Sequence, residues 1–355
     1  MAKLIVTGGA GFLGYHICNR LKDKYEKILV IDIDEFRKEE YPGNCEFVRG
    51  DVRDFDFLKE AFKGYDAVVH GAAALPLWKP KDIYSVNVDG TKNVLEAAKA
   101  NGINRVVYVS STAVYGVPDH HPLYENDELI GVGPYGETKI MAEKICGEYR
   151  GEMVVPVVRP KTFIGTERLG VFTILYDWVE SGALIPVIGK GKNRYQLLEV
   201  QDLVDAIYLM LSKPADVAND TFNVGAKDTK TIEEYLSEFF ESVGSSSAIM
   251  KTPAKLLIFF LEILWMLRVS PLYKWVYGTA HKDSFVSIEK AEQKLGWKPQ
   301  YTEAQALAHS YNWYKKHKEE VQGSGSGVTH RVAWKQGVIG IFKKPMVWMN
   351  RRKKS

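Results

Sequence analysis

A tyrosine and a lysine four residues apart, Tyr135 and Lys139 in the segment YGETK, are the residues whose types and spacing point most directly to chemistry. On a helix this spacing places both side chains on one face. A tyrosine hydroxyl has an ordinary pKa of about 10 and is a poor base at neutral pH. A lysine ammonium beside it stabilises the tyrosinate, so the pair can act as acid or base towards a substrate hydroxyl.

A hydroxyl-rich segment, SSTAVYG, precedes this pair and directly follows the buried run RVVYV. Side chains that follow a parallel strand lie at the carboxyl edge of the sheet, where ligands bind in α/β folds. We therefore predict that a hydroxyl of this segment hydrogen-bonds the substrate oxygen that becomes a carbonyl.

The glycine-rich segment TGGAGFLG follows a strand-like run and opens a helical pattern. Gly8 permits a tight turn, Gly11 allows backbone to come close to a pyrophosphate, and Gly14 lets helix pack on strand. Phe12 and Leu13 begin the helix, whose free N–H groups and dipole favour an anion. The segment predicts a dinucleotide site.

An acid closes the next strand, ILVID, at Asp32. Its carboxylate is placed to accept hydrogen bonds from both adenosine ribose hydroxyls, as in dinucleotide-binding folds. Because a carboxylate repels a 2′-phosphate, Asp32 favours NAD over NADP.

Two further strand ends complete the predicted cofactor site. Asp51 and Val52 follow the third strand and would frame the adenine. Ala72 and Ala73, in HGAAA, are small enough to let the sheet edge approach the nicotinamide. His70, which opens HGAAA, is interpreted as a structural residue.

The elements that must position these residues alternate between short β-branched runs and longer amphipathic ones through the first half of the chain. This alternation predicts an α/β fold, a Rossmann-type doubly wound parallel sheet, with a smaller C-terminal substrate-binding region. We divide the chain into an NAD-binding domain (1–160), a substrate-binding region (161–320) and a C-terminal tail (321–355).

In this order, TGGAGFLG, Asp51, NVDGTKNVLEAA, SSTAVYG and YGETK resemble the extended short-chain dehydrogenase/reductase superfamily. The resemblance covers about residues 1–316. The superfamily includes nucleotide-sugar epimerases, sugar dehydratases and 3β-hydroxysteroid dehydrogenases. Its members often dimerise through two helices of the nucleotide domain, so the resemblance is compatible with a homodimer.

The resemblance also implies roles. Tyr135 matches the proton-transferring residue, and Lys139 matches its activator, which also binds the nicotinamide ribose. Ser111 matches the hydroxyl that binds the substrate oxygen, with its neighbour Thr112 as the alternative. Asn87, in NVDGT, matches a position that supports the active site on the cofactor side.

The sequence departs from one branch of the superfamily. Sugar 4,6-dehydratases carry an Asp-Glu pair just after the active-site hydroxyl residue, whereas this chain has Thr112 and Ala113 there. Dehydration is therefore disfavoured, which leaves epimerisation, simple oxidation or reduction, and oxidative decarboxylation.

Two substrate-side positions bear on the choice. Arg194, in GKGKNRYQLLEVQDLVDA, falls where nucleotide-sugar epimerases use an arginine to bind the pyrophosphate, and a guanidinium fork suits that anion. Thr162, three residues after Arg159, stands where those epimerases have asparagine, so the sugar-nucleotide contacts are not all retained.

The apolar stretch at residues 252–278 favours a lipid-like substrate instead, because sterol-acting relatives have a similar run. It is too short to span a bilayer, and we predict no conventional transmembrane span elsewhere. A buried core helix and membrane contact both fit it.

The tail is basic. Residues 321–355 contain eight Lys and Arg and no acid, so the rest of the chain carries a net charge of −5, against +3 overall. The local charge argues against a nucleic-acid partner. A Gly-Ser joint at 323–327 is expected to decouple the tail from the body. Tryptophans among bases suggest anchoring to an anionic membrane surface.

Three alternatives remain at this point: an NAD-dependent epimerase acting on a nucleotide-linked or lipid-linked diphosphate sugar, a 3β-hydroxysteroid-type dehydrogenase at the membrane, and a non-catalytic NAD-binding scaffold. The three widely spaced cysteines give no metal site and fit a reduced compartment. We expect a cytoplasmic protein associated peripherally with the membrane.

Overall fold

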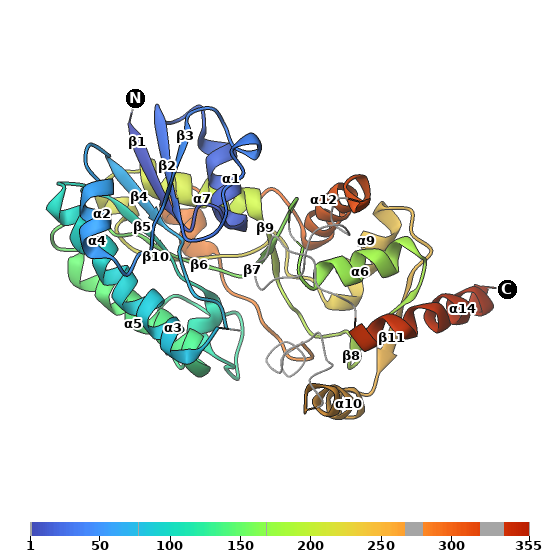
Figure 1. Ribbon diagram of the computed structural model, residues 1–355. Helices are drawn as coiled ribbons and strands as arrows, with labels where there is room; N and C mark the ends of the chain where they lie inside the picture. Colours follow the sequence, from blue (N-terminus) through green and yellow to red (C-terminus); the bar gives the residue numbers. More distant parts are fainter. Residues whose placement is uncertain (1, 77, 168, 267–279, 320–336, 355) are drawn as a thin grey trace. The chain divides into compact units, whose positions relative to one another are not determined.

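The computed structural model describes residues 2–76, 78–167, 169–266, 280–319 and 337–354, which form two compact units (Figure 1). The first comprises Met1–Phe163, Val200–Gly225 and Val286–Gln300. The second comprises Ile164–Glu199, Ala226–Phe285 and Tyr301–Ser355. The units therefore interleave along the chain, whereas the sequence suggested contiguous ranges.

The first unit is built on a seven-stranded parallel sheet in the order β10-β6-β5-β4-β1-β2-β3. The strands are β1 (Lys3–Thr7), β2 (Lys27–Asp32), β3 (Cys45–Arg49), β4 (Ala67–His70), β5 (Val106–Val109), β6 (Val157–Pro160) and β10 (Thr221–Val224). The central strands β4, β5 and β6 are buried at every residue, which explains their continuous β-branched runs. The predicted Rossmann-type sheet is confirmed.

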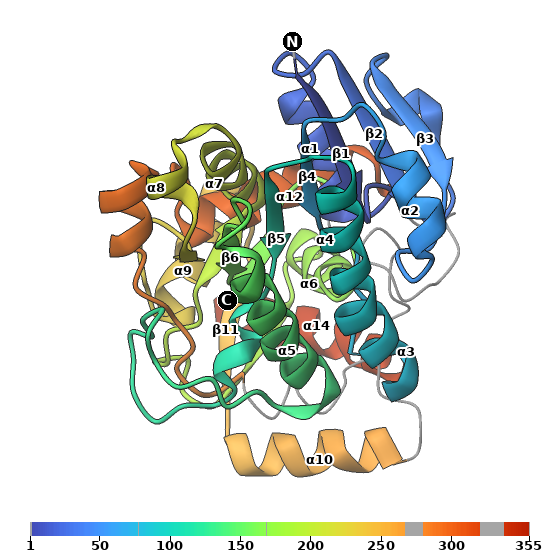
Figure 2. The same cartoon turned by 90° about the vertical axis from the view of Figure 1, so that its left-hand side faces the viewer.

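Helices cover both faces of this sheet. They are α1 (Phe12–Leu21), α2 (Phe55–Ala61), α3 (Pro80–Tyr84), α4 (Gly90–Ala100), α5 (Gly133–Tyr149), α7 (Val200–Ser212) and α8 (Ala215–Ala218), with short helical turns η1 (Lys38–Glu40), η2 (Ser85–Asp89), η3 (Thr112–Tyr115) and η4 (Ala291–Leu295). Helix α4 contacts both α2 and α5 on one face, and α1 contacts α7 on the other (Figure 2). The strand order reverses between β1 and β4, and the crevice at this switch point is where such folds bind ligands.

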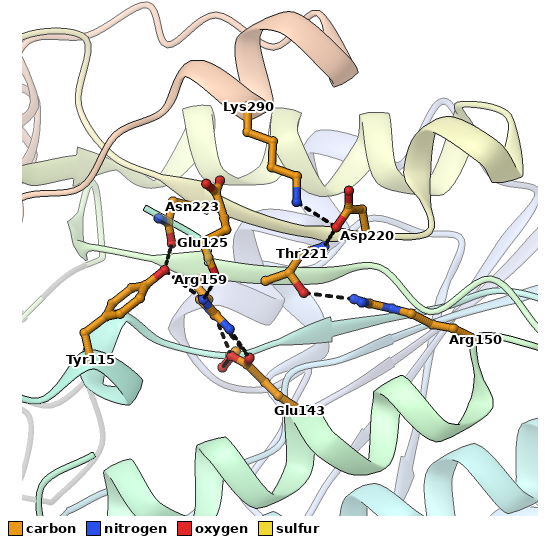
Figure 3. Close-up of polar contacts among 10 residues, drawn as sticks. Tyr115, Glu125, Glu143, Arg150, Arg159, Asp220, Thr221, Asn223 and Lys290 are labelled. Carbon is orange, nitrogen blue, oxygen red and sulfur yellow. Dashed lines mark hydrogen bonds and ion pairs between the residues drawn. The ribbon is translucent and has the colours of Figure 1, made fainter. Parts of the chain in front are cut away.

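The seventh strand, β10, lies in one of the two later segments that return to the first unit. It comes from the TFNVG run and pairs in parallel with β6, with Thr221 opposite Val157. Arg150 donates a hydrogen bond to the Thr221 hydroxyl at 2.9 Å, and Lys290 pairs with Asp220 at 2.7 Å (Figure 3). These contacts fix a segment from the second half of the chain to the first unit.

The second unit contains α6 (Phe172–Glu180), β8 (Leu184–Ile188), β9 (Leu197–Glu199), α9 (Ile232–Ser242), β11 (Ala248–Thr252), α10 (Ala254–Met266), α12 (Glu303–Lys316), η5 (Gly337–Phe342) and α14 (Lys343–Lys354), and the chain enters it through β7 (Thr162–Ile164). Strands β8 and β11 pair in parallel, and α9 packs on α12 around an aromatic core that includes Tyr176, Phe239 and Tyr311. In the described residues we find no helix long and apolar enough to cross a membrane.

The C-terminal helix α14 differs from the expected free tail. Met346 and Val347 pack against the core of the second unit, and Lys343 pairs with Asp177 at 2.5 Å. Asn350 is buried and donates to the Gly182 and Ser246 carbonyls at 2.9 and 2.7 Å. The predicted decoupling is therefore wrong for this helix, because one of its faces is apolar and hydrogen-bonded to the body. The Gly-Ser joint at 323–327 lies outside the described residues.

Candidate active site

The loop between β1 and α1 is shaped by its glycines. Gly8 has a φ of +69°, and a Cβ there would lie 2.7 Å from the Ala72 backbone nitrogen. A Cβ on Gly14 would lie 2.4 Å from the Gly9 Cα. Gly11, the N-cap of α1, has no side chain over the first N–H groups of that helix. Glycine at 8 and 14 thus allows close backbone packing, and Gly11 adds no side chain at the N-terminus of α1. We call this loop the glycine cradle; a glycine loop at a helix N-terminus fits the pyrophosphate of a dinucleotide, with Phe12 and Leu13 in the first turn of α1.

Asp32 is joined to this loop. Its Oδ2 accepts a hydrogen bond from the Ala10 N–H at 2.9 Å, and its Oδ1 accepts one from the Asp34 N–H at 3.1 Å. Asp32 ends β2, the strand beside β1, so the carboxylate lies at the carboxyl edge of the sheet next to the glycine cradle. This is the placement that the sequence predicted for a ribose ligand.

The second predicted acid has a partner that the sequence analysis did not foresee. Arg53 forms a bidentate ion pair with Asp51, with 2.5 Å between Nη2 and Oδ2. The hydrogen bonds from the Arg53 guanidinium hold the pKa of Asp51 below its ordinary value. Val52 is buried, and a Cβ on Gly90 would lie 2.6 Å from its Cγ2, so Val52 packs against the start of α4.

His70 is a structural residue, as expected. It is buried, with Nδ1 2.7 Å from the Thr7 hydroxyl and Nε2 3.0 Å from the Thr91 hydroxyl. Burial, reinforced by the Lys139 charge, lowers the pKa of His70 to about 3, so the imidazole is neutral. It ties β1 and β4 to α4.

Tyr135 and Lys139 lie one turn apart on α5, and the Lys139 Nζ is 5.9 Å from the Tyr135 ring centroid. The same Nζ donates to the Val109 carbonyl at 2.9 Å and to the Tyr108 hydroxyl at 3.2 Å. Burial lowers the pKa of Lys139 to about 8, and the charge of Glu143 opposes this effect. The ammonium is therefore held at the end of β5, beside the tyrosine.

The predicted hydroxyl residues begin the turn after β5. Ser111 is the N-cap of η3, and its Oγ accepts a hydrogen bond from the Ala113 N–H at 3.2 Å. Thr112 donates to the Pro160 carbonyl at 3.3 Å. A Cβ on Gly136 would lie 3.0 Å from the Ala113 carbonyl oxygen, so glycine at this position lets α5 approach η3 closely. The structure thus brings the Ser111 segment against the helical turn that carries Tyr135.

Asn87 connects the loop after β4 to the same helix. It is buried in η2, accepts a hydrogen bond from the Ala74 N–H at 2.8 Å, and donates to the Ala74 carbonyl at 3.2 Å. Its amide also donates to the Thr138 hydroxyl at 3.1 Å, between Tyr135 and Lys139. These contacts agree with the supporting role that the resemblance implies for Asn87.

A buried network that the sequence analysis missed fixes the inner side of α5 (Figure 3). Arg159, in β6, forms a bidentate ion pair with Glu143, which lies one turn beyond Lys139. Ser110 donates to the same carboxylate, and Arg159 donates to the Tyr115 hydroxyl at 2.8 Å. Tyr115 in turn donates to Asn223 at 2.7 Å. The spacing of Tyr135, Lys139 and Glu143 at i, i+4 and i+8 was the available signal for Glu143.

A second missed residue is Lys161, between Arg159 and the predicted ligand Thr162. Lys161 is buried at the carboxyl end of β6, and burial lowers its pKa to about 7. Thr162 is half-buried at the start of β7. In the sequence, Lys161 follows the strand-like run in the segment VVRPKT, and nothing in this pattern predicted that its side chain would be buried.

Arg194 belongs to the second unit. Its backbone N–H donates to Asp283 at 2.8 Å, and its guanidinium lies over the Phe285 ring, 5.7 Å from the centroid. The side chain is exposed, so the guanidinium is held against an aromatic face with its donors accessible.

The comparison with family models decides the family. The model described as "NAD dependent epimerase/dehydratase family" matches residues 4–225. The chain belongs to this family.

Relatives agree with this assignment over nearly the whole chain. The uncharacterized protein y4nG of Sinorhizobium fredii is 34% identical, over 95% of this chain and 85% of the relative. The putative UDP-glucose 4-epimerase of Methanocaldococcus jannaschii is 27% identical, over 88% of this chain and 98% of the relative. Among solved structures, the Bordetella bronchiseptica enzyme WbmG in complex with NAD and UDP superposes with a TM-score of 0.71 at 22% identity, covering 88% of this chain and 94% of that one.

As a member of the NAD-dependent epimerase/dehydratase family, the protein is an enzyme of the extended short-chain dehydrogenase/reductase type that uses NAD. The glycine cradle and the Asp32 carboxylate fit that cofactor, because the first lies at the N-terminus of α1, which favours phosphate, and the second disfavours a 2′-phosphate. The enzyme prediction and the cofactor prediction are both confirmed.

Proposed function

We propose that this enzyme is an epimerase that inverts a secondary hydroxyl of a sugar carried on a diphosphate, with a nucleoside diphosphate sugar as the first candidate. The observation that carries the proposal is the juxtaposition of Lys139 with Tyr135, close to the turn that begins at Ser111. That arrangement suits reversible oxidation of an alcohol at the carboxyl edge of the sheet.

The proposed chemistry begins with Tyr135 as the base. Its phenolate takes the proton of the substrate hydroxyl while the hydride on the same carbon leaves, and the product is a ketone. The Ser111 hydroxyl donates a hydrogen bond to the substrate oxygen, and the Lys139 ammonium stabilises the phenolate. Bound NAD would supply the hydride acceptor and the hydride donor. Tyr135 gives the proton back once the ketone has been reduced on its opposite face.

Thr112 and Ala113 favour epimerisation over dehydration. Elimination of water requires an additional acid and base next to the ketone, and in this chain the two positions after Ser111 carry a hydroxyl and a methyl group. Thr112 is moreover engaged with the Pro160 carbonyl at 3.3 Å. An intermediate ketone would therefore persist until hydride returns to it.

Arg194 supports a diphosphate in the substrate. Its guanidinium offers forked donors that match a pyrophosphate, and it lies over the Phe285 ring, 5.7 Å from the ring centroid. A UDP-sugar also agrees with the names of the relatives, one a putative UDP-glucose 4-epimerase. The names of the relatives give no support to the steroid dehydrogenase or scaffold alternatives. A lipid-linked diphosphate sugar stays an alternative substrate, because it carries the same diphosphate that Arg194 would bind.

The test is to incubate the purified enzyme with NAD and a panel of UDP-hexoses and UDP-N-acetylhexosamines. We expect a sugar epimer to form without net accumulation of NADH, and Tyr135→Phe to reduce the rate at least ~100-fold, the usual range for loss of a general acid–base. A matched control is Tyr124→Phe, because Tyr124 is an exposed tyrosine of the same unit. Net NADH production or a dehydrated sugar would contradict the epimerase proposal, and inactivity on all UDP-sugars would redirect it to lipid-linked diphosphates.

A further inference from the structure

Helix α10 has an apolar surface that the second unit does not cover. Leu257, Ile258 and Leu261 face inward, where they pack against Ile188 of β8. Four large side chains on the rest of the helix are exposed, and their exposed fractions are 66% for Leu256, 61% for Phe259, 41% for Phe260 and 72% for Met266. Residues 267–278 of the apolar stretch lie outside the described residues. In the described part a buried core helix accounts for the inner face of α10 only, because these four other side chains of the helix form an exposed apolar surface.

The C-terminal segment extends this surface. Phe342, at the end of η5, makes an edge-to-face contact with Phe260 of α10, with 6.4 Å between ring centroids. Ile341 beside it is 71% exposed, and Trp348 on α14 is 54% exposed. Residues 343, 346, 347 and 350 hold α14 to the body, so the apolar side chains of both helices belong to the same compact unit.

Exposed basic side chains lie on the same helices as these apolar groups. Lys344, Arg351 and Arg352 are exposed on α14, and Lys255 is exposed in the first turn of α10. The Arg352 guanidinium stacks on the Trp348 ring, 3.9 Å from the centroid. The sequences of η5 and α14 contain no acid, and that of α10 contains one, Glu262.

We propose that the exposed side chains of α10, η5 and α14 form a docking face for the surface of an anionic phospholipid bilayer. Aromatic and aliphatic groups enter the headgroup boundary, tryptophan settles there, and arginine and lysine meet lipid phosphates and carboxylates. Charge complementarity selects this occupant over a second copy of the chain, because two such faces would bring their bases together. The docking face is independent of the proposed epimerase activity and does not require a lipid-linked substrate.

The experiment measures co-sedimentation of the full-length protein with phosphatidylcholine vesicles, with and without phosphatidylserine. One variant removes the apolar contact (Leu256→Asp with Phe259→Asp), and another reverses the bases (Lys344→Glu, Arg351→Glu and Arg352→Glu). We expect the full-length protein to bind the anionic vesicles. We expect each variant to weaken that binding at least about tenfold, since three bases and two large apolar groups each contribute substantially to partitioning. Epimerisation of soluble sugars should stay unchanged in both, which separates this test from the fate of the proposed function.

Matched controls exclude a general effect of charge or polarity. Val48→Asp places a carboxylate at an exposed apolar site on β3, and Lys22→Glu, Lys38→Glu and Lys298→Glu together change the net charge as much as the base-reversal variant does. Both controls should bind vesicles as the wild type does. The proposal is overturned if the wild type binds neither vesicle or if the apolar variant binds as well as the wild type. It is also overturned if the wild type is a dimer in solution and the apolar variant is a monomer. The last result would identify a protein interface instead.

Discussion

The Glu143 carboxylate and the Arg159 guanidinium form a buried ion pair, with 2.6 Å between Oε2 and Nη2 and side-chain exposures of 7% and 5%. Glu143 lies on the same helix as Tyr135 and Lys139, and Arg159 lies in β6 of the sheet. The pair therefore locks the helix that carries the candidate catalytic residues to the sheet. Its carboxylate also opposes the lowering of the Lys139 pKa by burial.

We expect Glu143→Gln to lose both effects. Removing one partner of a buried ion pair costs on the order of 3–5 kcal/mol of unfolding free energy, because the remaining charge is left without compensation. The pKa of Lys139, about 8 in the wild type, should fall further once the nearby negative charge is gone. The pH profile of kcat/KM should then show an alkaline limb near pH 8 in the wild type and at lower pH in the variant.

A double variant separates the two roles. In Glu143→Gln with Arg159→Met no unpaired charge remains, so most of the lost stability should return while the alkaline limb stays shifted. If the limb returns to its wild-type position together with the stability, Glu143 acts only through folding and the electrostatic assignment fails.

Substitution by alanine should have opposite effects on stability at two glycines of α5. A Cβ at Gly136 would lie 3.0 Å from the Ala113 carbonyl oxygen, whereas a Cβ at Gly147 has no atom within 4 Å. Gly136→Ala should push α5 away from η3, destabilise the protein by about 1–3 kcal/mol and lower kcat roughly tenfold or more. Gly147→Ala should stabilise it by about 0.5–1 kcal/mol through helix propensity, with no change in kcat. Thermal unfolding and steady-state kinetics of both variants check this, and a Gly136→Ala enzyme with wild-type kcat would show that the close approach is not needed.

Glu303, fully buried at the start of α12, should make stability depend on pH. Burial raises its pKa from 4.5 to about 7, although backbone amides of Glu303 and Lys230 lower it in part. The folded state therefore holds this proton more tightly than the unfolded state. The resulting stabilisation is complete below pH 4.5 and is lost as the pH rises through 7.

Glu303→Gln tests this assignment, because glutamine stays neutral. The stability of the variant relative to the wild type should increase by roughly 2–3 kcal/mol between pH 5 and pH 8, the free-energy equivalent of the raised pKa. Urea unfolding at both pH values provides the measurement, with the exposed Glu241→Gln on α9 as the control. A difference between Glu303→Gln and wild type that is the same at both pH values would place the pKa of Glu303 near its ordinary value.

Local patterns in the sequence were sufficient for the parts of the site whose geometry is local. The glycines at 8 and 14, the acid at 32, and the Tyr135–Lys139 spacing each act within one turn, strand end or helix face. Periodicity likewise predicted the parallel sheet, because its central strands are buried on both faces and must be continuously apolar.

Contacts between distant segments were decided only by the tertiary structure. The seventh strand comes from residues 221–224, and the pairing of Glu143 with Arg159 and of Asn87 with Thr138 depends on which elements become neighbours in the sheet and its covering helices. The same holds for the C-terminal helix, which the sequence alone presented as a free basic tail. The charge pattern of the sequence indicates what one face of this helix can bind. Only the folded chain shows that the other face packs against the body through Met346, Val347 and Asn350.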